Sequence, residues 1–203
     1  GFRVEPVGPS FWGGKTYEWL KKRRVHGVAV VTGPDRRHLV LVGMMGVGKS
    51  TVGRAVAAQL HRPLFDSDEM IEARVGRTVR EIWLDDGEPA FRALEADVLR
   101  EALELDEPSV IAAAGGVVLG EANRTLLTSS DAHVVWLRAD VDVLVERVRN
   151  GPHRPLLDDD PEGTLRRLYD ERAPRYQEVA DAIVSVDHRT VNDVTKAVLR
   201  CCA

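Results

Sequence analysis

The sequence has few cysteines and no long apolar run. Its only cysteines, Cys201 and Cys202, are adjacent near the end of the 203-residue chain. Neighbours in sequence rarely reach good disulfide geometry, so we expect a reducing, cytoplasmic setting. No stretch of 18 apolar residues is present, and no charged segment, apolar run and cleavage site open the chain. We therefore expect neither a membrane span nor a secretion signal.

Charge is distributed unevenly along the chain. The net charge is −4, yet residues 1–38 hold eight Lys/Arg against three Asp/Glu, which leaves the remainder acidic. An acidic body argues against a general nucleic-acid-binding protein. We expect a basic N-terminal extension over residues 1–38 and one domain over residues 39–203. The extension is either a solvated segment, with Val28–Val31 as a short strand, or an arm that binds an unknown partner.

From His38 onward, short apolar runs alternate with longer segments of helical spacing. The runs are apolar on both faces, as buried parallel strands are, and the alternation predicts an α/β fold with a parallel sheet. The expected strands are Leu39–Val42, Pro63–Phe65, Val110–Ala114, His133–Leu137 and Ala182–Val186. The expected helices are Lys49–Leu60, Pro89–Leu105, Val141–Val148 and Gly163–Val179, the last broken or kinked at Pro174.

The strongest motif is a glycine-rich loop between the first strand and the first helix. Gly43-Met44-Met45-Gly46-Val47-Gly48-Lys49-Ser50, followed by Thr51, matches the complete phosphate-binding pattern. The glycines let backbone N–H groups turn toward phosphate oxygens, and the helix points its positive end at the same anion. Lys49 is expected to reach the β- and γ-phosphates, and the Ser50 hydroxyl to ligate Mg²⁺. The motif predicts ATP or GTP binding.

Two carboxylates follow the second strand. Asp66 and Asp68 lie at the carboxyl end of a parallel strand, where such sheets bind ligands. Asp66 could support the metal, and Asp68 could hold an acceptor hydroxyl. Ser67 or Asp68 could also simply cap the following helix, Glu69–Val75, and the two roles are compatible.

Arginines and glycines make up the other candidates. Arg92 and Glu95 are three residues apart on one helix face, which is also the spacing of an ordinary surface ion pair. Gly115 and Gly116 follow the third strand and permit close approach of a ligand. Arg154 lies in a Gly/Pro-bounded loop that is either a mobile lid or a surface loop. Arg172 lies on the last long helix, and Arg189 follows the final strand, where a base could rest.

Together these segments resemble the shikimate kinases, within the wider nucleoside-monophosphate-kinase-like group. The similarity runs from about Leu39 to Leu199 and rests on GMMGVGKST, FDSD, DGEPAFRALE, AGGVVL, RPLL and ERAPRYQEVA in that order. It implies a three-layer P-loop kinase fold, with a five-stranded parallel sheet covered by helices on both faces and a mobile lid. The family commonly has three glycines where this chain has Ala114-Gly115-Gly116.

The resemblance also implies a role for each residue that matches a family motif. Lys49, Asp68 and Arg154 would be catalytic, and Ser50 and Asp66 would serve Mg²⁺, with Asp66 acting through water. The acceptor would contact Asp68, Arg92, Gly115, Gly116 and Arg172, with Glu95 steadying the arginines. ATP would be bound by Gly43, Met45, Gly46, Val47, Gly48, Lys49, Ser50, Thr51, Arg154 and Arg189.

The expected activity is ATP-dependent phosphorylation of the 3-hydroxyl of shikimate by a monomer, without nucleic-acid partners. Two arginines suit a carboxylate and an aspartate suits a polyol, which together describe a hydroxylated carboxylic acid. One alternative is a kinase for another cyclitol or sugar acid. The other is a catalytically silent nucleotide-binding module whose basic extension binds a partner.

Overall fold

The computed structural model describes residues 37–149 and 160–202. Residues 1–36, with the expected strand Val28–Val31, and the loop that carries Arg154 lie outside the described residues. Within the described part, five strands form one parallel sheet in the order β2-β3-β1-β4-β5. The expected five-stranded parallel sheet is therefore confirmed.

The strands begin and end close to the predicted positions. They are β1 Leu39–Val42, β2 Leu64–Asp66, β3 Val110–Ala112, β4 His133–Arg138 and β5 Ala182–Ser185. β1 lies at the centre, with Leu39 opposite Val110 on one side and His133 on the other. All four β1 side chains are buried, because helices cover both faces of the sheet.

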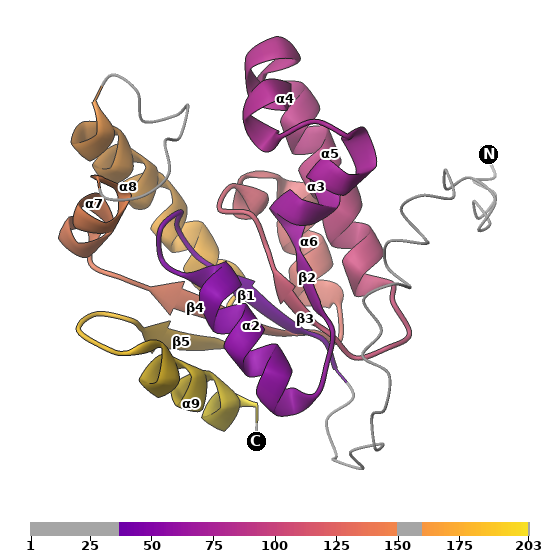
Figure 1. The fold of residues 1–203 in the computed structure, drawn as a ribbon, viewed down its shortest axis with the longest axis vertical. Coiled ribbons are helices and arrows are strands. Elements are labelled where there is room, and N and C mark those ends of the chain that lie inside the picture. The colour runs from indigo at the N-terminus through magenta and orange to yellow at the C-terminus, as the bar shows by residue number, and fades with distance from the viewer. Residues whose placement is uncertain (1–36, 150–159, 203) are drawn as a thin grey trace.

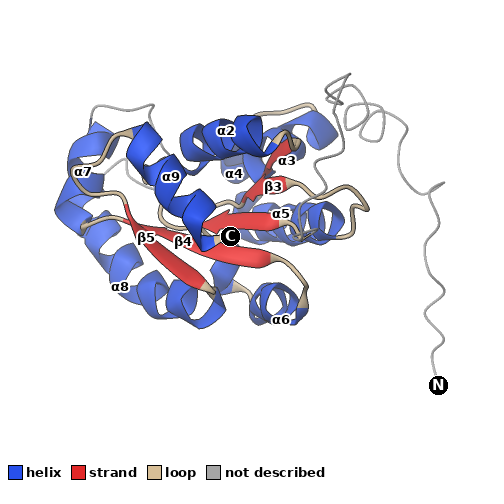
Figure 2. Cartoon of the chain, turned by 90° about the horizontal axis from the view of Figure 1, so that it is seen from below, coloured by secondary structure: helices blue, strands red, loops and turns tan. Residues whose placement is uncertain are grey.

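Helices cover the sheet in two layers, as Figures 1 and 2 show. α2 and α9 lie over one face, whereas α5, α6 and α8 lie over the other. The helices are α2 Lys49–Leu60, α3 Ser67–Val75, α4 Val79–Asp85, α5 Gly87–Leu103, α6 Glu121–Ser129, α7 Val141–Arg149, α8 Pro161–Val179 and α9 Val191–Cys201, with a 3₁₀ turn, η2, at Val117–Leu119. No helix among residues 37–149 and 160–202 is both long and apolar enough to cross a membrane.

Two local expectations are corrected. The cap of α3 is neither Ser67 nor Asp68 but Asp66, whose Oδ1 accepts a hydrogen bond from the Asp68 backbone N–H at 3.1 Å. α8 runs on through Pro174, so the helix is not broken there. At the other end of the domain, α9 ends at Cys201, and both cysteines pack half-buried against the core.

Candidate functional site

The phosphate loop joins β1 to α2 and depends on glycine at several positions. Gly43, Gly46 and Gly48 have φ values of 144°, 79° and 100°, which lie in the region that favours glycine. A Cβ at Gly43 would also lie 2.4 Å from the backbone oxygen of Leu137. Only glycine at position 43 lets the loop turn this close to β4.

The first turn of α2 faces the loop without a side-chain cap. Gly48 occupies the N-cap position and makes no capping hydrogen bond, so the helix presents its positive end to the loop. Lys49 Nζ donates to the backbone oxygens of Gly43 at 2.8 Å and Met44 at 3.1 Å. The ammonium group is thereby held across the loop. A helix N-terminus and a lysine side by side form an environment that favours phosphate.

Ser50 and Asp66 form a pair of oxygen donors next to this loop. Ser50 Oγ donates to Asp66 Oδ2 at 2.6 Å, which joins the first turn of α2 to the end of β2. The Asp66 carboxylate is buried and also caps α3, so its position is fixed from two sides. A hydroxyl and a carboxylate are ligands of the kind that Mg²⁺ prefers.

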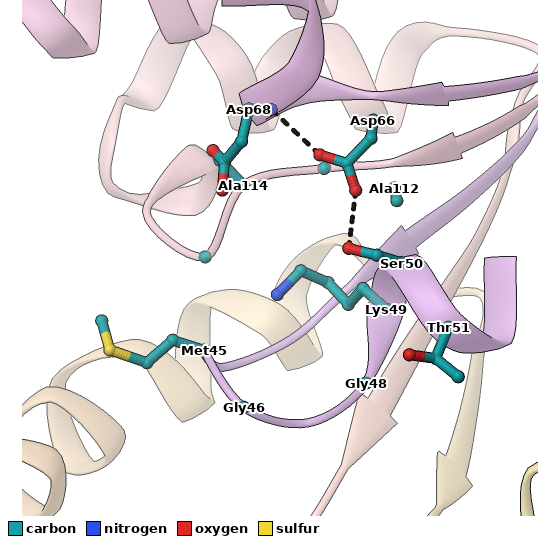
Figure 3. Close-up of a pocket in the computed structure, with 12 residues that line it drawn as sticks. Met45, Gly46, Gly48, Lys49, Ser50, Thr51, Asp66, Asp68, Ala112 and Ala114 are labelled. Carbon is teal, nitrogen blue, oxygen red and sulfur yellow. Dashed lines mark hydrogen bonds between the residues drawn. The ribbon is translucent and has the colours of Figure 1, made fainter. Parts of the chain in front are cut away.

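A cavity of about 210 Å³ lies over these groups. Figure 3 shows Lys49 extending into it from α2 and the Asp68 carboxylate directed into it from the start of α3. The cavity is lined by Met45, Gly46, Gly48, Lys49, Ser50, Thr51, Asp66, Asp68, Ala112, Ala113, Ala114 and Gly115. The cavity therefore joins the predicted nucleotide groups to the aspartate predicted to hold the acceptor.

Arg92 lies on α5 with its guanidinium held by two carboxylates. Nη1 donates to both oxygens of Glu95 at 3.0 Å, whereas Nε and Nη2 donate to Glu88 at 3.1 and 2.9 Å. The guanidinium lies directly on the backbone of Gly116, where a Cβ would come within 1.9 Å of Nη1. Arg92 and Glu95 thus form the i,i+3 ion pair that their spacing predicts. The pair is not on an open surface, because the guanidinium packs against Gly116.

Arg172 reaches the same glycine turn from α8. Its side chain is 2% exposed, and Nη1 donates to the Gly115 backbone oxygen at 3.2 Å. Its buried Nε has no hydrogen-bond partner among the described residues. A buried donor left without an acceptor is costly, so the turn has a group ready to donate to a ligand.

The charges of Arg92, Asp68 and Arg172 all act on the pKa of the Glu95 carboxyl. Burial raises the pKa of the Glu95 carboxyl above its ordinary value, and Arg92 opposes that rise. Asp68 raises the same pKa further and Arg172 lowers it. Residues from α3, α5 and α8 are thus close enough to form one electrostatic cluster.

The structure brings most of the predicted site residues together in two places, the cavity at the phosphate loop and the arginine cluster at Gly115 and Gly116. Six of the predicted ATP-binding residues line the cavity, while Gly43 and Val47 lie beneath it as part of the loop backbone. Arg189 is not among them. It lies after β5, beside α9, in a separate cavity of about 290 Å³ that is also lined by Asp193, Ala197 and Arg200. Arg154 lies outside the described residues.

Some residues at the site received no role from the sequence. Arg147 of α7 donates to the Val47 backbone oxygen at 3.3 Å, and the Arg92 guanidinium lies 5.4 Å from the ring centre of Trp83 on α4. Tyr176 donates its hydroxyl hydrogen to the Gly115 oxygen. Of these residues, only Tyr176 could have been placed at the site from the sequence. It lies four residues after Arg172, so the two side chains share one face of the helix.

Comparisons with known proteins agree with this geometry. The sequence model of the shikimate kinase family matches residues 45–203. The chain is 47% identical over 152 residues to the shikimate kinase of Bradyrhizobium diazoefficiens, covering 74% of this chain and 72% of that protein. It is 44% identical over 153 residues to the shikimate kinase of Chromobacterium violaceum, covering 75% and 82%.

A solved structure gives the same result. The shikimate kinase from Acinetobacter baumannii, in complex with shikimate, superposes with a TM-score of 0.77 at 36% identity, covering 81% of this chain and 91% of that chain. With its phosphate loop, its paired aspartates and its arginine–glycine cluster, the chain belongs to the shikimate kinase family.

Proposed function

We propose that this chain transfers the γ-phosphoryl group of ATP to the 3-hydroxyl of shikimate, which yields shikimate 3-phosphate and ADP. One observation carries the proposal: the cavity at the phosphate loop is bounded by Asp68 and Gly115, and Gly115 is held by Arg172. The donor groups and the acceptor groups therefore meet at one point. A relative at 36% identity has been solved with shikimate bound.

The acceptor cluster fits the chemistry of a hydroxylated carboxylic acid. Arg92 and Arg172 supply guanidinium donors for a carboxylate, and the Asp68 carboxylate supplies an acceptor for a hydroxyl. Glu95 holds Arg92 in place, and Gly116 leaves room for its guanidinium. Ala114 lines the cavity at the position where the family commonly has glycine.

The reaction needs mainly positioning and charge neutralisation. Asp68 accepts the proton of the 3-hydroxyl. The hydroxyl oxygen bonds to the γ-phosphorus, while the bond from that phosphorus to the ADP oxygen breaks. Lys49 and the N-terminus of α2 stabilise the negative charge on the phosphate oxygens. Arg154 would contribute from the loop before α8.

Mg²⁺ fits the oxygen donors of Ser50 and Asp66. No group of three or more His, Cys, Asp or Glu residues in the described part of the chain is arranged to hold a metal. Mg²⁺ in phosphoryl-transfer sites commonly takes most of its ligands from water and substrate phosphates. Ser50 would bind it directly and Asp66 through water, and the bound ion would neutralise charge on the β- and γ-phosphates. A cytoplasmic monomer is part of the proposal, because ATP is the donor and one chain supplies every proposed group.

The direct test measures ADP release with Mg²⁺ and ATP, alone and with shikimate, quinate or gluconate. We expect release with shikimate only. The variants Asp68→Asn and Arg172→Ala should each lose activity by at least about 100-fold while ATP still binds. Asp97→Asn and Arg175→Ala are matched controls at half-buried positions of α5 and α8 whose side chains pair with Arg100 and Glu171, and they should retain activity. Full activity in Asp68→Asn and Arg172→Ala would contradict the proposed roles, and release with another acid only would change the acceptor.

A further inference from the structure

Tyr176 is a fully buried polar side chain beside the site. Its side chain is 0% exposed, and its ring stacks on Trp136 of β4 with ring centres 5.7 Å apart. The hydroxyl donates to the Gly115 backbone oxygen and lies 3.8 Å from Met44 Sδ. Burial raises the pKa of Tyr176 above its ordinary value, so the phenol remains a neutral hydrogen-bond donor.

The two contacts of this hydroxyl lie on different loops. Met44 belongs to the phosphate loop, and Gly115 belongs to the turn after β3. The loops are packed closely here, since a Cβ at Gly115 would lie 3.3 Å from the Met45 nitrogen and 3.5 Å from the Gly43 oxygen. The Tyr176 hydroxyl therefore lies where the phosphate loop (the donor loop) meets the turn after β3 at Gly115 (the acceptor turn).

The Gly115 oxygen also accepts a hydrogen bond from Arg172, one helical turn before Tyr176 on α8. One carbonyl thus takes hydrogen bonds from a fixed phenol and from a guanidinium. The phenol has only two rotatable side-chain bonds and is held by its stack on Trp136. The Gly115 carbonyl therefore lies between a phenol held by ring stacking and the guanidinium of Arg172.

We propose that Tyr176 is a positioning residue for the acceptor: its hydroxyl fixes the Gly115 carbonyl and thereby aims Arg172 at the acceptor carboxylate. The inference rests on the proposed function and adds a residue that touches neither substrate. The Arg172 Nε, which is buried without a partner in the described structure, is the donor that this alignment would present. A misdirected guanidinium would weaken acceptor binding more than the chemical step.

The test compares Tyr176→Phe with Tyr169→Phe. Tyr176→Phe keeps the ring and its stack and removes only the hydroxyl. Tyr169 lies two turns earlier on α8, half-buried against the core, and provides the same chemical change away from the turn. In Tyr176→Phe we expect the KM for shikimate to rise about 5- to 10-fold, with kcat and the KM for ATP changed less than about twofold. Tyr169→Phe should leave all three unchanged.

One kinetic result would overturn the inference: an unchanged KM for shikimate in Tyr176→Phe, whether or not kcat falls. If Tyr176→Phe lacks a cooperative thermal transition, 3-fluorotyrosine at position 176 is the second variant, because it keeps the ring and the hydroxyl and makes the phenol a stronger donor. A changed KM for shikimate then supports the inference, and an unchanged one contradicts it.

Failure of the proposed function is distinguishable from failure of this inference. A wild-type chain that phosphorylates quinate or gluconate instead of shikimate would refute the proposed acceptor. The same comparison of KM values on the accepted acid would then still decide whether Tyr176 positions Arg172, because all three acids carry a carboxylate.

Discussion

Replacing Gly116 by alanine tests how the guanidinium of Arg92 is held. The backbone of Gly116, with φ −94° and ψ −3°, is accessible to alanine, so the substitution introduces no backbone strain. The added Cβ would lie 1.9 Å from Arg92 Nη1 and 2.4 Å from Cζ. The guanidinium must therefore move by about 1.5 Å to restore an ordinary contact.

This movement removes the pairing between Arg92 and Glu95. Both bonds from Nη1 to the Glu95 oxygens are 3.0 Å long, and such a displacement takes them beyond hydrogen-bond distance. Glu95 is 1% exposed, so its carboxylate would remain buried without its main partner. Hydrogen bonds to charged groups contribute about 1.5–3 kcal/mol. We therefore expect kcat/KM for shikimate to fall about 10- to 100-fold.

The assay is steady-state kinetics with shikimate varied at saturating ATP, together with thermal unfolding. Gly120→Ala is the matched control in the same loop, because its Cβ would lie 3.4 Å from Asn123 Nδ2, an ordinary contact. It should retain wild-type kinetics. A value of kcat/KM within twofold of wild type in Gly116→Ala would refute the argument that this glycine is required by the position of Arg92.

Two further predictions concern the carboxylates. Asp66→Ala should lower the free energy of unfolding in urea by about 1 kcal/mol, because the α3 cap is lost, whereas Asp66→Asn should keep the cap. Both variants should raise the KM for Mg·ATP. Equal stability of the two variants would contradict the capping role. Burial raises the pKa of Glu95, so the folded state binds the Glu95 proton more tightly than the unfolded chain does. The contribution of Glu95 to stability therefore falls as pH rises from the ordinary glutamate pKa through the raised one. The stability of Glu95→Gln relative to wild type should therefore increase over that interval and level off above it. As pH falls through the same interval, the KM for shikimate should rise, because a protonated Glu95 holds Arg92 less well; a KM that is independent of pH there would contradict this role.

Strong local patterns made much of the fold predictable. β1 Leu39–Val42 and α2 Lys49–Leu60 have the predicted bounds, because a wholly apolar run and a glycine-to-helix boundary are encoded within a few residues. The short helix α4 was not predicted. It has seven residues, and depends on a capping box between Thr78 and Glu81 and on packing against α5.

The site was predictable to a lesser degree. The phosphate loop is continuous in sequence, so its glycines, Lys49 and Ser50 could be assigned directly. Arg92 and Arg172 are 80 positions apart, and each alone has the pattern of an ordinary surface arginine. Only the order of motifs that resembles a known family gave them a role in advance. Tyr176 and Trp83 had none, because their importance depends on what the folded chain places beside them.

The sequence by itself determined the strands, the phosphate loop and the pair of aspartates, because each of these patterns lies within a short stretch of the chain. The alternation of strands and helices then indicated that the strands pair in parallel, although the paired strands are far apart in sequence. Tertiary structure alone decided that α5 and α8 bring their arginines to adjacent glycines of one turn, Arg92 to Gly116 and Arg172 to Gly115. It also decided that Asp66 serves both a helix cap and Ser50, and that a buried tyrosine joins the donor loop to the acceptor turn. The physical reason is that burial, unpaired donors and close backbone approach are properties of packed neighbours, and packing selects those neighbours from distant parts of the chain.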